Sequence, residues 1–129
     1  MSANDSNFAE KVTILIVEDS PTQALKLQHV LERHNFAVLC EPDGVRALEA
    51  MAVCAPTLVI TDVNMPNMDG ITLCKELRGL PLYKGIPILI LTTESAVETK
   101  SRGKLAGATG WIVKPFNPDQ LLATIAKVL

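Results

Sequence analysis

The fold of this chain is decided by residues 57–70, TLVITDVNMPNMDG. The first five residues form an uninterrupted β-branched and aliphatic run, which is typical of a strand buried on both faces of a parallel sheet. A single carboxylate, Asp62, follows this run directly. The next residues are typical of a turn, and they end in Asp69–Gly70, where Asp69 can cap a helix. The stretch therefore predicts a strand, a loop headed by an acidic residue, and a helix from about Gly70 to Arg78.

The same alternation of strand and helix runs through the rest of the chain. Four more apolar runs predict strands at Val12–Val17, Ala37–Cys40, Pro87–Leu91 and Gly110–Val113. Further helices are predicted at Pro21–His34, Gly44–Val53, Ala96–Ala106 and Pro118–Leu129. Ser20-Pro21-Thr22-Gln23 and Asn117-Pro118-Asp119-Gln120 each place a cap residue, a Pro at the first helical position and a Gln at the third, as in a capping box. Asp43 can cap the helix that follows it.

Helix 96–106 has the least support, because it has few large apolar residues and an internal Gly103. Five strands, each followed by a helix, nevertheless give a (βα)5 pattern. Right-handed crossovers then place helices on both faces of one parallel sheet, so we expect a doubly wound α/β protein of three layers, α/β/α. Residues 12–129 are expected to form this single domain, with residues 1–11 as a flexible tail and no output domain after the fifth helix.

Composition and charge exclude several classes of function. The chain has 129 residues, of which 48% are hydrophobic and 20% charged, as in an ordinary globular domain. Its 12 basic and 14 acidic residues give a net charge of -2, which argues against nucleic acid or an anionic membrane as partner. The sequence has no apolar run of the roughly 20 residues that a membrane span needs. Cys40, Cys54 and Cys74 lack metal-site spacing, so we expect reduced cysteines and a cytoplasmic protein.

Polar residues stand at the carboxyl ends of four of the five predicted strands. Glu18 and Asp19 follow the first, Asp62 the third, Thr92 the fourth and Lys114 the fifth. Open α/β sheets bind ligands beyond these strand ends, where the strand order reverses. Any one of these residues is explained well as a helix cap or a solvated strand end. All of them together predict a functional site at this edge of the sheet.

The chemistry of these side chains indicates a metal-dependent phosphoryl site. Three carboxylates, Glu18, Asp19 and Asp62, repel one another unless a cation lies among them. Mg2+ suits such a set, because it takes oxygen ligands and retains several waters. Lys114 supplies a positive charge for the remaining oxygens of an anion, and Thr92 supplies a hydroxyl donor. A carboxylate in such a site can act as a nucleophile toward phosphorus.

Four segments carry a resemblance to a known family. They are Val17–Ser20 (VEDS), Thr61–Gly70 (TDVNMPNMDG), Leu91–Glu94 (LTTE) and Gly107–Phe116 (GATGWIVKPF). In this order and at these strand ends they resemble the receiver domain of two-component response regulators, in particular the stand-alone chemotaxis (CheY-like) type. The resemblance covers about residues 12–129. It implies a flavodoxin-like fold with five parallel strands in the order 2-1-3-4-5.

The resemblance also implies roles for the site residues. Asp62 accepts a phosphoryl group from a histidine kinase and becomes an acyl phosphate. Asp62 also belongs to the Mg2+ site, with Asp19 as a direct ligand, Glu18 through water, and the backbone carbonyl of Asn64. Lys114 contacts the phosphoryl group, and its peptide bond to Pro115 is expected to be cis.

A conformational switch is part of the same resemblance. Thr92 moves toward the phosphoryl oxygen, and Trp111 rotates inward into the vacated space. The surface that changes and binds a downstream protein consists of helix 96–106, strand 110–113 and helix 118–129. Asn64 and Glu94 match receivers that lose the phosphoryl group rapidly, which suggests a short-lived signal. The chain is then a signalling module, expected to be monomeric, that catalyses only its own phosphorylation and dephosphorylation and is not otherwise an enzyme.

Three positions depart from the usual pattern of the family. Glu18 stands where Asp is common, and we expect its longer side chain to reach a metal-bound water. Trp111 stands where Tyr or Phe is usual, so a larger ring with an N–H donor has to find a pocket. Thr93 is bulkier than the Ala often found there, and we expect it to restrict access of small phosphodonors.

Three alternatives stay open at this point. The first is a receiver domain that belongs to a longer hybrid kinase or effector-bearing regulator. The second is a haloacid-dehalogenase-type phosphatase, which places a second Asp where this chain has Asn64. The third is a flavodoxin-like FMN carrier, in which Glu18 and Asp19 would repel the FMN phosphate without a metal.

Overall fold

The computed structural model describes residues 11–93 and 97–129. Its strands are β1 (Thr13–Val17), β2 (Ala37–Glu41), β3 (Leu58–Thr61), β4 (Ile88–Thr92) and β5 (Gly110–Val113). Its helices are α2 (Pro21–Arg33), α3 (Gly44–Val53), α4 (Gly70–Arg78), α5 (Val97–Ala106) and α6 (Pro118–Val128), with a short 3-10 helix η1 (Pro81–Tyr83). The ends of these strands and helices lie within one residue of the predicted ones. The predicted tail, apart from Lys11, and Glu94 lie outside the described residues.

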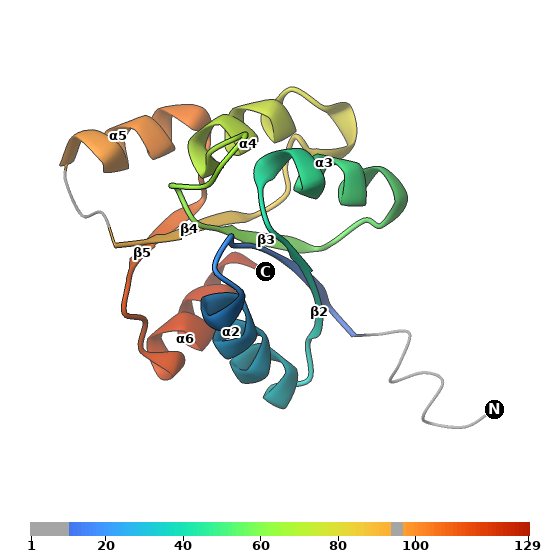
Figure 1. Cartoon of the computed structure of the whole chain (residues 1–129), viewed down its shortest axis with the longest axis vertical. Helices are drawn as coiled ribbons and strands as arrows, with labels where there is room; N and C mark the ends of the chain where they lie inside the picture. Colours follow the sequence, from blue (N-terminus) through green and yellow to red (C-terminus); the bar gives the residue numbers. More distant parts are fainter. Residues whose placement is uncertain (1–10, 94–96) are drawn as a thin grey trace.

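The five strands are parallel and form one sheet in the order β2-β1-β3-β4-β5. Helices α2 and α6 cover one face, and α3, α4 and α5 cover the other (Figure 1). Each helical layer encloses its own apolar core against the sheet. This arrangement confirms the predicted flavodoxin-like, doubly wound fold with three layers. The strand order reverses between β1 and β3, and this point is the expected location of a ligand site.

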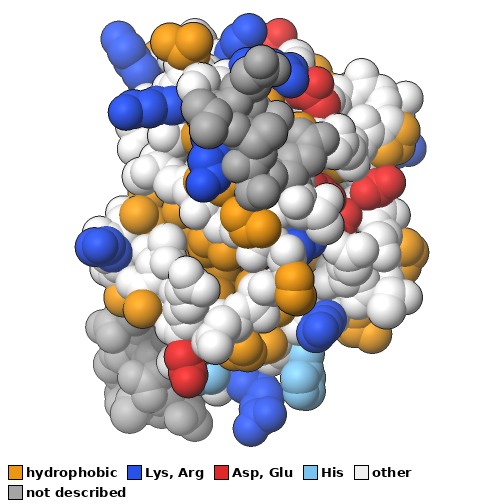
Figure 2. Space-filling view, turned by 90° about the vertical axis from the view of Figure 1, so that its left-hand side faces the viewer, with side chains coloured by type: hydrophobic (Ala, Val, Ile, Leu, Met, Phe, Trp, Pro, Cys, Tyr) orange, Lys and Arg blue, Asp and Glu red, His pale blue; other side chains and the backbone are white. Residues whose placement is uncertain are grey.

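Burial on both faces, which is typical of continuous apolar runs, is not found at the edges of the sheet. Strands β1, β3 and β4 are buried almost throughout, whereas β2 and β5 are partly exposed. Cys40 of β2 is exposed, and Val113 of β5 is 39% exposed. Each edge strand has only one neighbouring strand, so a continuous apolar run does not by itself guarantee burial there. Figure 2 shows the resulting apolar surface on the face formed by α5, β5 and α6.

The predicted helix caps are present, with one difference. Asp43 Oδ1 accepts a hydrogen bond from Arg46 N at 2.9 Å, and Asp69 Oδ1 accepts one from Thr72 N at 2.7 Å. Asn117 caps α6 in the same way. At α2, Ser20 Oγ accepts from Gln23 N at 3.4 Å, but the Ser20 N–H donates to Glu18 Oε2 rather than to the Gln23 side chain. Only one of the two hydrogen bonds of the capping box forms, and the Gln23 side chain takes no part in the cap.

Gly103, which weakens the prediction of α5, has a packing role. A Cβ atom at this position would lie 2.7 Å from Cζ3 of Trp111 and 3.2 Å from Cδ1 of Ile90. A Cβ contact of 2.7 Å is shorter than carbon atoms tolerate, and one of 3.2 Å is tighter than most such contacts. The absence of a side chain therefore lets α5 lie close to the indole ring on β5. The sequence predicts that this glycine weakens the helix, but it does not predict the contact with the indole ring.

The connection after α4 includes η1, which the sequence analysis missed. The Arg78 guanidinium donates to the carbonyl oxygens of Gly107, Tyr83 and Lys84, at 2.9, 3.2 and 3.2 Å. The buried Tyr83 hydroxyl donates to the Met51 carbonyl oxygen. These bonds tie two loops to the core. Cys74 is buried, and Cys40, Cys54 and Cys74 are free cysteines. Within the described part of the chain, no helix is long and apolar enough to cross a membrane.

Substitution of Gly70 by Ala tests the close approach between the start of α4 and the end of β3. A Cβ atom on Gly70 would lie 1.9 Å from the backbone oxygen of Asp62, so the two segments have to separate. We expect Gly70→Ala to lower the free energy of unfolding by at least about 2 kcal/mol, measured by urea denaturation. Gly85→Ala is the control, because nothing lies within 4 Å of its Cβ position. Equal stabilities of the two variants would contradict the steric argument.

Candidate functional site

The register of the parallel strands brings the predicted site residues to one edge of the sheet. Val17 of β1 pairs with Thr61 of β3, so Glu18 and Asp62 leave the sheet side by side. The Asp62 N–H donates to the Val17 carbonyl oxygen at 3.0 Å, which extends the pairing by one residue. On the other side, the N–H of Lys114 donates to the Thr92 carbonyl oxygen at 2.8 Å. Backbone pairing thus fixes where these side chains begin.

Three carboxylates converge at this edge. One oxygen from each of Glu18, Asp19 and Asp62 lies within 4.8 Å of the others. Glu18 is buried, Asp62 is half-buried and Asp19 is exposed. We call these three residues the acidic cluster. The predicted convergence of the three carboxylates is therefore present in the structure.

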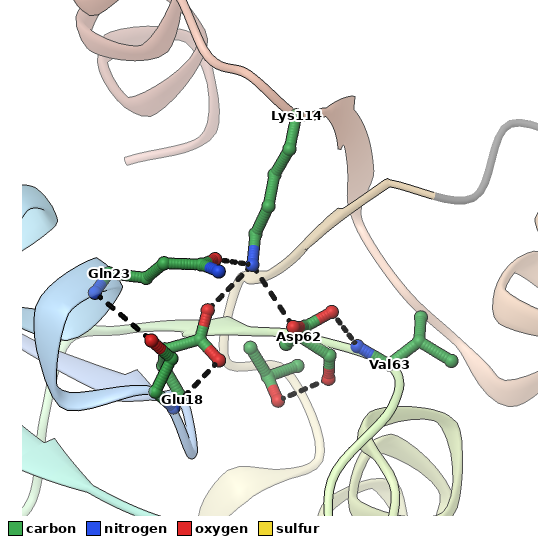
Figure 3. Close-up of polar contacts among 7 residues, drawn as sticks. Glu18, Gln23, Asp62, Val63 and Lys114 are labelled. Carbon is green, nitrogen blue, oxygen red and sulfur yellow. Dashed lines mark hydrogen bonds and ion pairs between the residues drawn. The ribbon is translucent and has the colours of Figure 1, made fainter.

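Lys114 reaches into the acidic cluster from the end of β5 (Figure 3). Its Nζ atom lies 2.6 Å from Glu18 Oε1 and 3.0 Å from Asp62 Oδ2. The side chains of this ion-paired group are only 13%, 6% and 14% exposed for Lys114, Glu18 and Asp62. The bond between Lys114 and Pro115 is cis, as the family resemblance predicted. A hollow of about 280 Å3 adjoins Lys114 and is bordered by Thr93 and Phe116.

The burial of these charges shifts their pKa values. Burial raises the pKa of the Glu18 carboxyl above its ordinary value of 4.5, although the hydrogen bond and charge of Lys114 act in the opposite direction. Burial alone would lower the pKa of Lys114, but its bonds to Glu18 and Asp62 outweigh that effect and raise it above 10.5. Lys114 is therefore a permanent cation at neutral pH. Burial therefore makes the ionised form of Glu18 less favourable than it is in water.

Asp62 is held by its own backbone surroundings. Its Oδ1 atom accepts a hydrogen bond from the Val63 N–H at 2.7 Å, whereas Oδ2 faces Lys114. The Asp62 carbonyl oxygen accepts from the buried Thr61 hydroxyl at 2.9 Å. Gly70 packs directly against this carbonyl group and donates its N–H to the Val63 carbonyl oxygen. The carboxylate of Asp62 thus has a fixed orientation toward the cation.

The donor set of the acidic cluster fits a divalent hard cation. Three carboxylates and one ammonium group leave a net charge of -2, which one divalent ion balances. The available atoms are oxygens, which Mg2+ prefers over nitrogen and sulfur. Glu18, Asp19 and Asp62 are the residues that could hold such an ion, and Asn64 is exposed in the loop directly after Asp62.

The two residues predicted to form the switch lie on neighbouring strands. Thr92 ends β4 and is fully buried. Trp111 of β5 is half-buried and packs against the core beneath α3, α4 and α5. Thr92 pairs with Val113, and Trp111 pairs with Ile90.

Asn67, in the turn before α4, has a left-handed φ of 68° and donates from its side chain to Asp43 Oδ2 at 2.9 Å, which agrees with the predicted turn.

Gln23 is a site residue that the sequence does not predict. Its side-chain oxygen accepts a hydrogen bond from Lys114 Nζ at 2.5 Å. The two residues are 91 positions apart in the sequence, and the pattern around Gln23 predicts only a helix cap. No local signal distinguishes it from Gln120 at the same position of α6. The role of Gly70 at Asp62 was likewise not predictable without the path of the chain.

The fold and the site define a flavodoxin-like α/β protein with an acidic cluster and a lysine at the point where the strand order reverses. The chain matches the response regulator receiver domain over residues 14–126, and it belongs to that family. Receiver domains accept phosphoryl groups from histidine kinases in two-component signal transduction. This membership leaves the phosphatase and FMN-carrier alternatives without support.

Individual relatives support the same assignment. The response regulator MprA of Mycobacterium tuberculosis is 36% identical over 118 residues, which are 92% of this chain and 50% of that protein. The alkaline phosphatase synthesis transcriptional regulatory protein PhoP of Bacillus subtilis is 36% identical over 116 residues, 90% of this chain and 48% of that protein. The chain thus spans about half the length of these curated relatives.

Solved structures of similar proteins include different kinds of receiver. The chemotaxis protein CheY4 of Vibrio cholerae has a TM-score of 0.88 and 42% identity, covering 92% of this chain and 99% of that chain. The signal receiver domain of a histidine kinase from Syntrophus aciditrophicus has a TM-score of 0.86 and 38% identity, covering 92% and 89%. Both a chemotaxis receiver and a kinase-borne receiver therefore resemble this chain closely.

The raised pKa of Glu18 predicts how its charge affects stability. The pKa of this carboxyl group is higher in the folded state than in the unfolded state, where it is about 4.5. The group therefore stabilises the fold at pH values below the pKa of the unfolded state, and this contribution is lost as the pH rises through the pKa of the folded state. We expect Glu18→Gln to remove this loss and to raise the free energy of unfolding at neutral pH, measured by urea denaturation with a chelator present.

Glu49→Gln is the matched control for this variant. Glu49 forms an exposed pair with Arg46 at 3.8 Å, for which we expect little change in stability at any pH. A Glu18→Gln variant less stable than wild type at neutral pH would mean that the ion pair with Lys114 outweighs the cost of burying the carboxylate.

Proposed function

We propose that the protein accepts a phosphoryl group on Asp62 from a histidine kinase. The observation that carries this proposal is the position of the Lys114 ammonium, 3.0 Å from Oδ2 of a carboxylate whose other oxygen is held by the Val63 N–H. A phosphoryl group transferred to Oδ2 would have a cation beside it from the start. Fixed positive charge of this kind stabilises the negative charge on phosphoryl oxygens.

The proposed reaction forms one bond and breaks one bond. The Asp62 carboxylate attacks phosphorus, the bond from phosphorus to the donor nitrogen breaks, and an acyl phosphate remains on Asp62. Mg2+, held by Glu18, Asp19, Asp62 and the carbonyl oxygen of Asn64, would supply charge compensation when bound. Lys114 would then contact the phosphoryl oxygens, while water returns the protein to its resting state by hydrolysing the acyl phosphate. Asn64 and Glu94 are proposed to set the rate of that hydrolysis.

The output of the proposed reaction is a change of surface. Thr92 would turn toward the phosphoryl group and Trp111 would turn inward, which alters the face formed by α5, β5 and α6. Basic side chains gather on the upper part of this face, over α5, and apolar ones lie below them (Figure 2). Lys100, Lys104 and Trp111 border a hollow of about 280 Å3 there. We propose that a downstream protein binds at this face.

The cellular context is proposed from similarity. The match to CheY4, which covers 99% of that chemotaxis protein, favours a chemotaxis-type receiver. Relatives such as PhoP, of which the chain spans half, favour instead a receiver within a larger regulator. We propose a monomeric, cytoplasmic receiver domain of residues 12–129 with a chemotaxis-type histidine kinase as donor. Binding to the kinase and target proteins of each context would distinguish the two.

Intact mass after incubation with acetyl phosphate tests the proposed acceptor. We expect one added phosphoryl group on the wild type in the presence of Mg2+, none without Mg2+, and none on Asp62→Ala. Asp119→Asn, a change in the first turn of α6, is the control and should behave as wild type. An adduct that persists in Asp62→Ala would refute the assignment. If acetyl phosphate fails with the wild type, a phosphorylated histidine kinase as donor separates restriction by Thr93 from loss of the reaction.

Trp111 provides a direct readout of the proposed switch, because it is the sole tryptophan of the chain. We expect phosphorylation to change its fluorescence emission, and Thr92→Ala to be phosphorylated while this change shrinks severalfold. Thr124→Ala is the control, since its hydroxyl donates only locally, to the Gln120 carbonyl oxygen at 2.8 Å. A full emission change in Thr92→Ala would disprove the link between the two residues.

A further inference from the structure

Three oxygens surround the ammonium group of Lys114. Gln23 Oε1 lies at 2.5 Å, Glu18 Oε1 at 2.6 Å and Asp62 Oδ2 at 3.0 Å (Figure 3). A lysine ammonium has three N–H donors and no acceptor, so these contacts use all of them. The contact with Gln23 is the shortest of the three, and Gln23 is the one neutral partner among them.

Gln23 reaches Lys114 because of the way α2 begins. In a complete capping box the Gln23 side chain would accept a bond from the Ser20 N–H. Here that N–H donates to Glu18 Oε2 at 3.4 Å, while Ser20 Oγ still accepts from Gln23 N. The cap therefore fixes the backbone of Gln23, and its amide extends from the first turn of α2 into the site instead of closing the cap.

Under the proposed function the two charged partners of Lys114 have other tasks. Glu18 and Asp62 would hold Mg2+, and Asp62 would also carry the phosphoryl group. Both tasks occupy carboxylate oxygens that contact the ammonium group in this structure. The side-chain carbonyl of Gln23 keeps its dipole throughout. The ammonium already contacts both carboxylates, so a divalent cation has to displace it from their oxygens. The Gln23 oxygen stays available as its acceptor, and without Gln23 this displacement would cost more free energy.

We propose that Gln23 is a positioning residue for Lys114, an inference that rests on the proposed function. Its side-chain oxygen holds Nζ on the α2 side of the acidic cluster. This contact retains the ammonium when a divalent cation takes the carboxylate oxygens, and it keeps one N–H of Lys114 directed at the phosphoryl group on Asp62. The segment from Ser20 to Gln23 therefore both begins a helix and positions the site lysine.

Three variants of the full chain test this role. Gln23→Met keeps the length of the side chain but removes the acceptor, and Gln23→Glu keeps an acceptor at the same reach. Gln28→Met makes the same change further along α2, where the amide donates to Glu32 Oε2 at 3.3 Å outside the acidic cluster. Mg2+ affinity is measured by calorimetry without a phosphodonor, and the phosphorylation rate by intact mass with acetyl phosphate at saturating Mg2+. Thermal melting monitors folding.

We expect Gln23→Met to weaken Mg2+ binding and to slow phosphorylation, each by about tenfold, as for the loss of a hydrogen bond to a charged group. Gln23→Glu should phosphorylate within about threefold of wild type, because it retains the oxygen acceptor. It should also bind Mg2+ at least as tightly, because it adds a carboxylate. Gln28→Met should match the wild type in both measurements.

Several results would overturn the inference. These are wild-type values for Gln23→Met, faster phosphorylation in that variant, or equal losses in Gln23→Met and Gln23→Glu. Failure of the proposed function is distinct, since the wild type itself would then take no phosphoryl group. In that case the Mg2+ titration still decides the positioning role: weaker binding by Gln23→Met supports it, and unchanged binding refutes it.

Discussion

The structure depends on one electrostatic constraint at the point where the strand order reverses. Parallel pairing of Val17 with Thr61 forces Glu18 and Asp62 to emerge together, and Asp19 adds a third carboxylate. Like charges at this spacing oppose folding. The pKa of Glu18 is raised mainly by burial, and the charge of Asp62 adds to that effect. The ammonium group of Lys114, brought in by the edge strand β5, offsets only part of it. The remaining negative charge attracts cations. The repulsion among the carboxylates, which destabilises the fold without a cation, would therefore favour the binding of one.

The layout of the sheet was predictable because its signals are local. Buried strands appear as uninterrupted apolar runs, and cap residues such as Asp43 and Asp69 stand directly before their helices. Both kinds of signal can be recognised in a single sequence, so the predicted ends of these strands and helices lie within one residue of the observed ones. The convergence of Glu18, Asp19 and Asp62 followed from the topology alone, since the carboxyl ends of parallel strands share one edge. The roles assigned to these residues came from family resemblance rather than from spacing.

What sequence analysis missed depends on contacts between distant segments. The partner of Gln23 is 91 residues away. Gln120 occupies the same position in a similar four-residue cap sequence, and there the sequence forms an ordinary helix start. The exposure of β2 and β5 depends on having a single neighbouring strand, which an apolar run does not reveal. The 3-10 turn after α4 is held by Arg78, whose acceptors lie in two separate loops. In each case the deciding neighbour is set by the path of the chain.

The fit between Gly103 and Trp111 has a consequence for how such a domain can diverge. The indole ring occupies the space in which a Cβ atom on α5 would lie, so neither position can change freely while the other stays as it is. A side chain gained first at position 103 meets the ring, and a ring lost first at position 111 leaves a void beneath the helix. Divergent copies of this domain should therefore exchange the two residues as a pair, with a smaller aromatic ring accompanying any side chain on the helix. The large ring at position 111 and the missing side chain at position 103 are therefore expected to be inherited together.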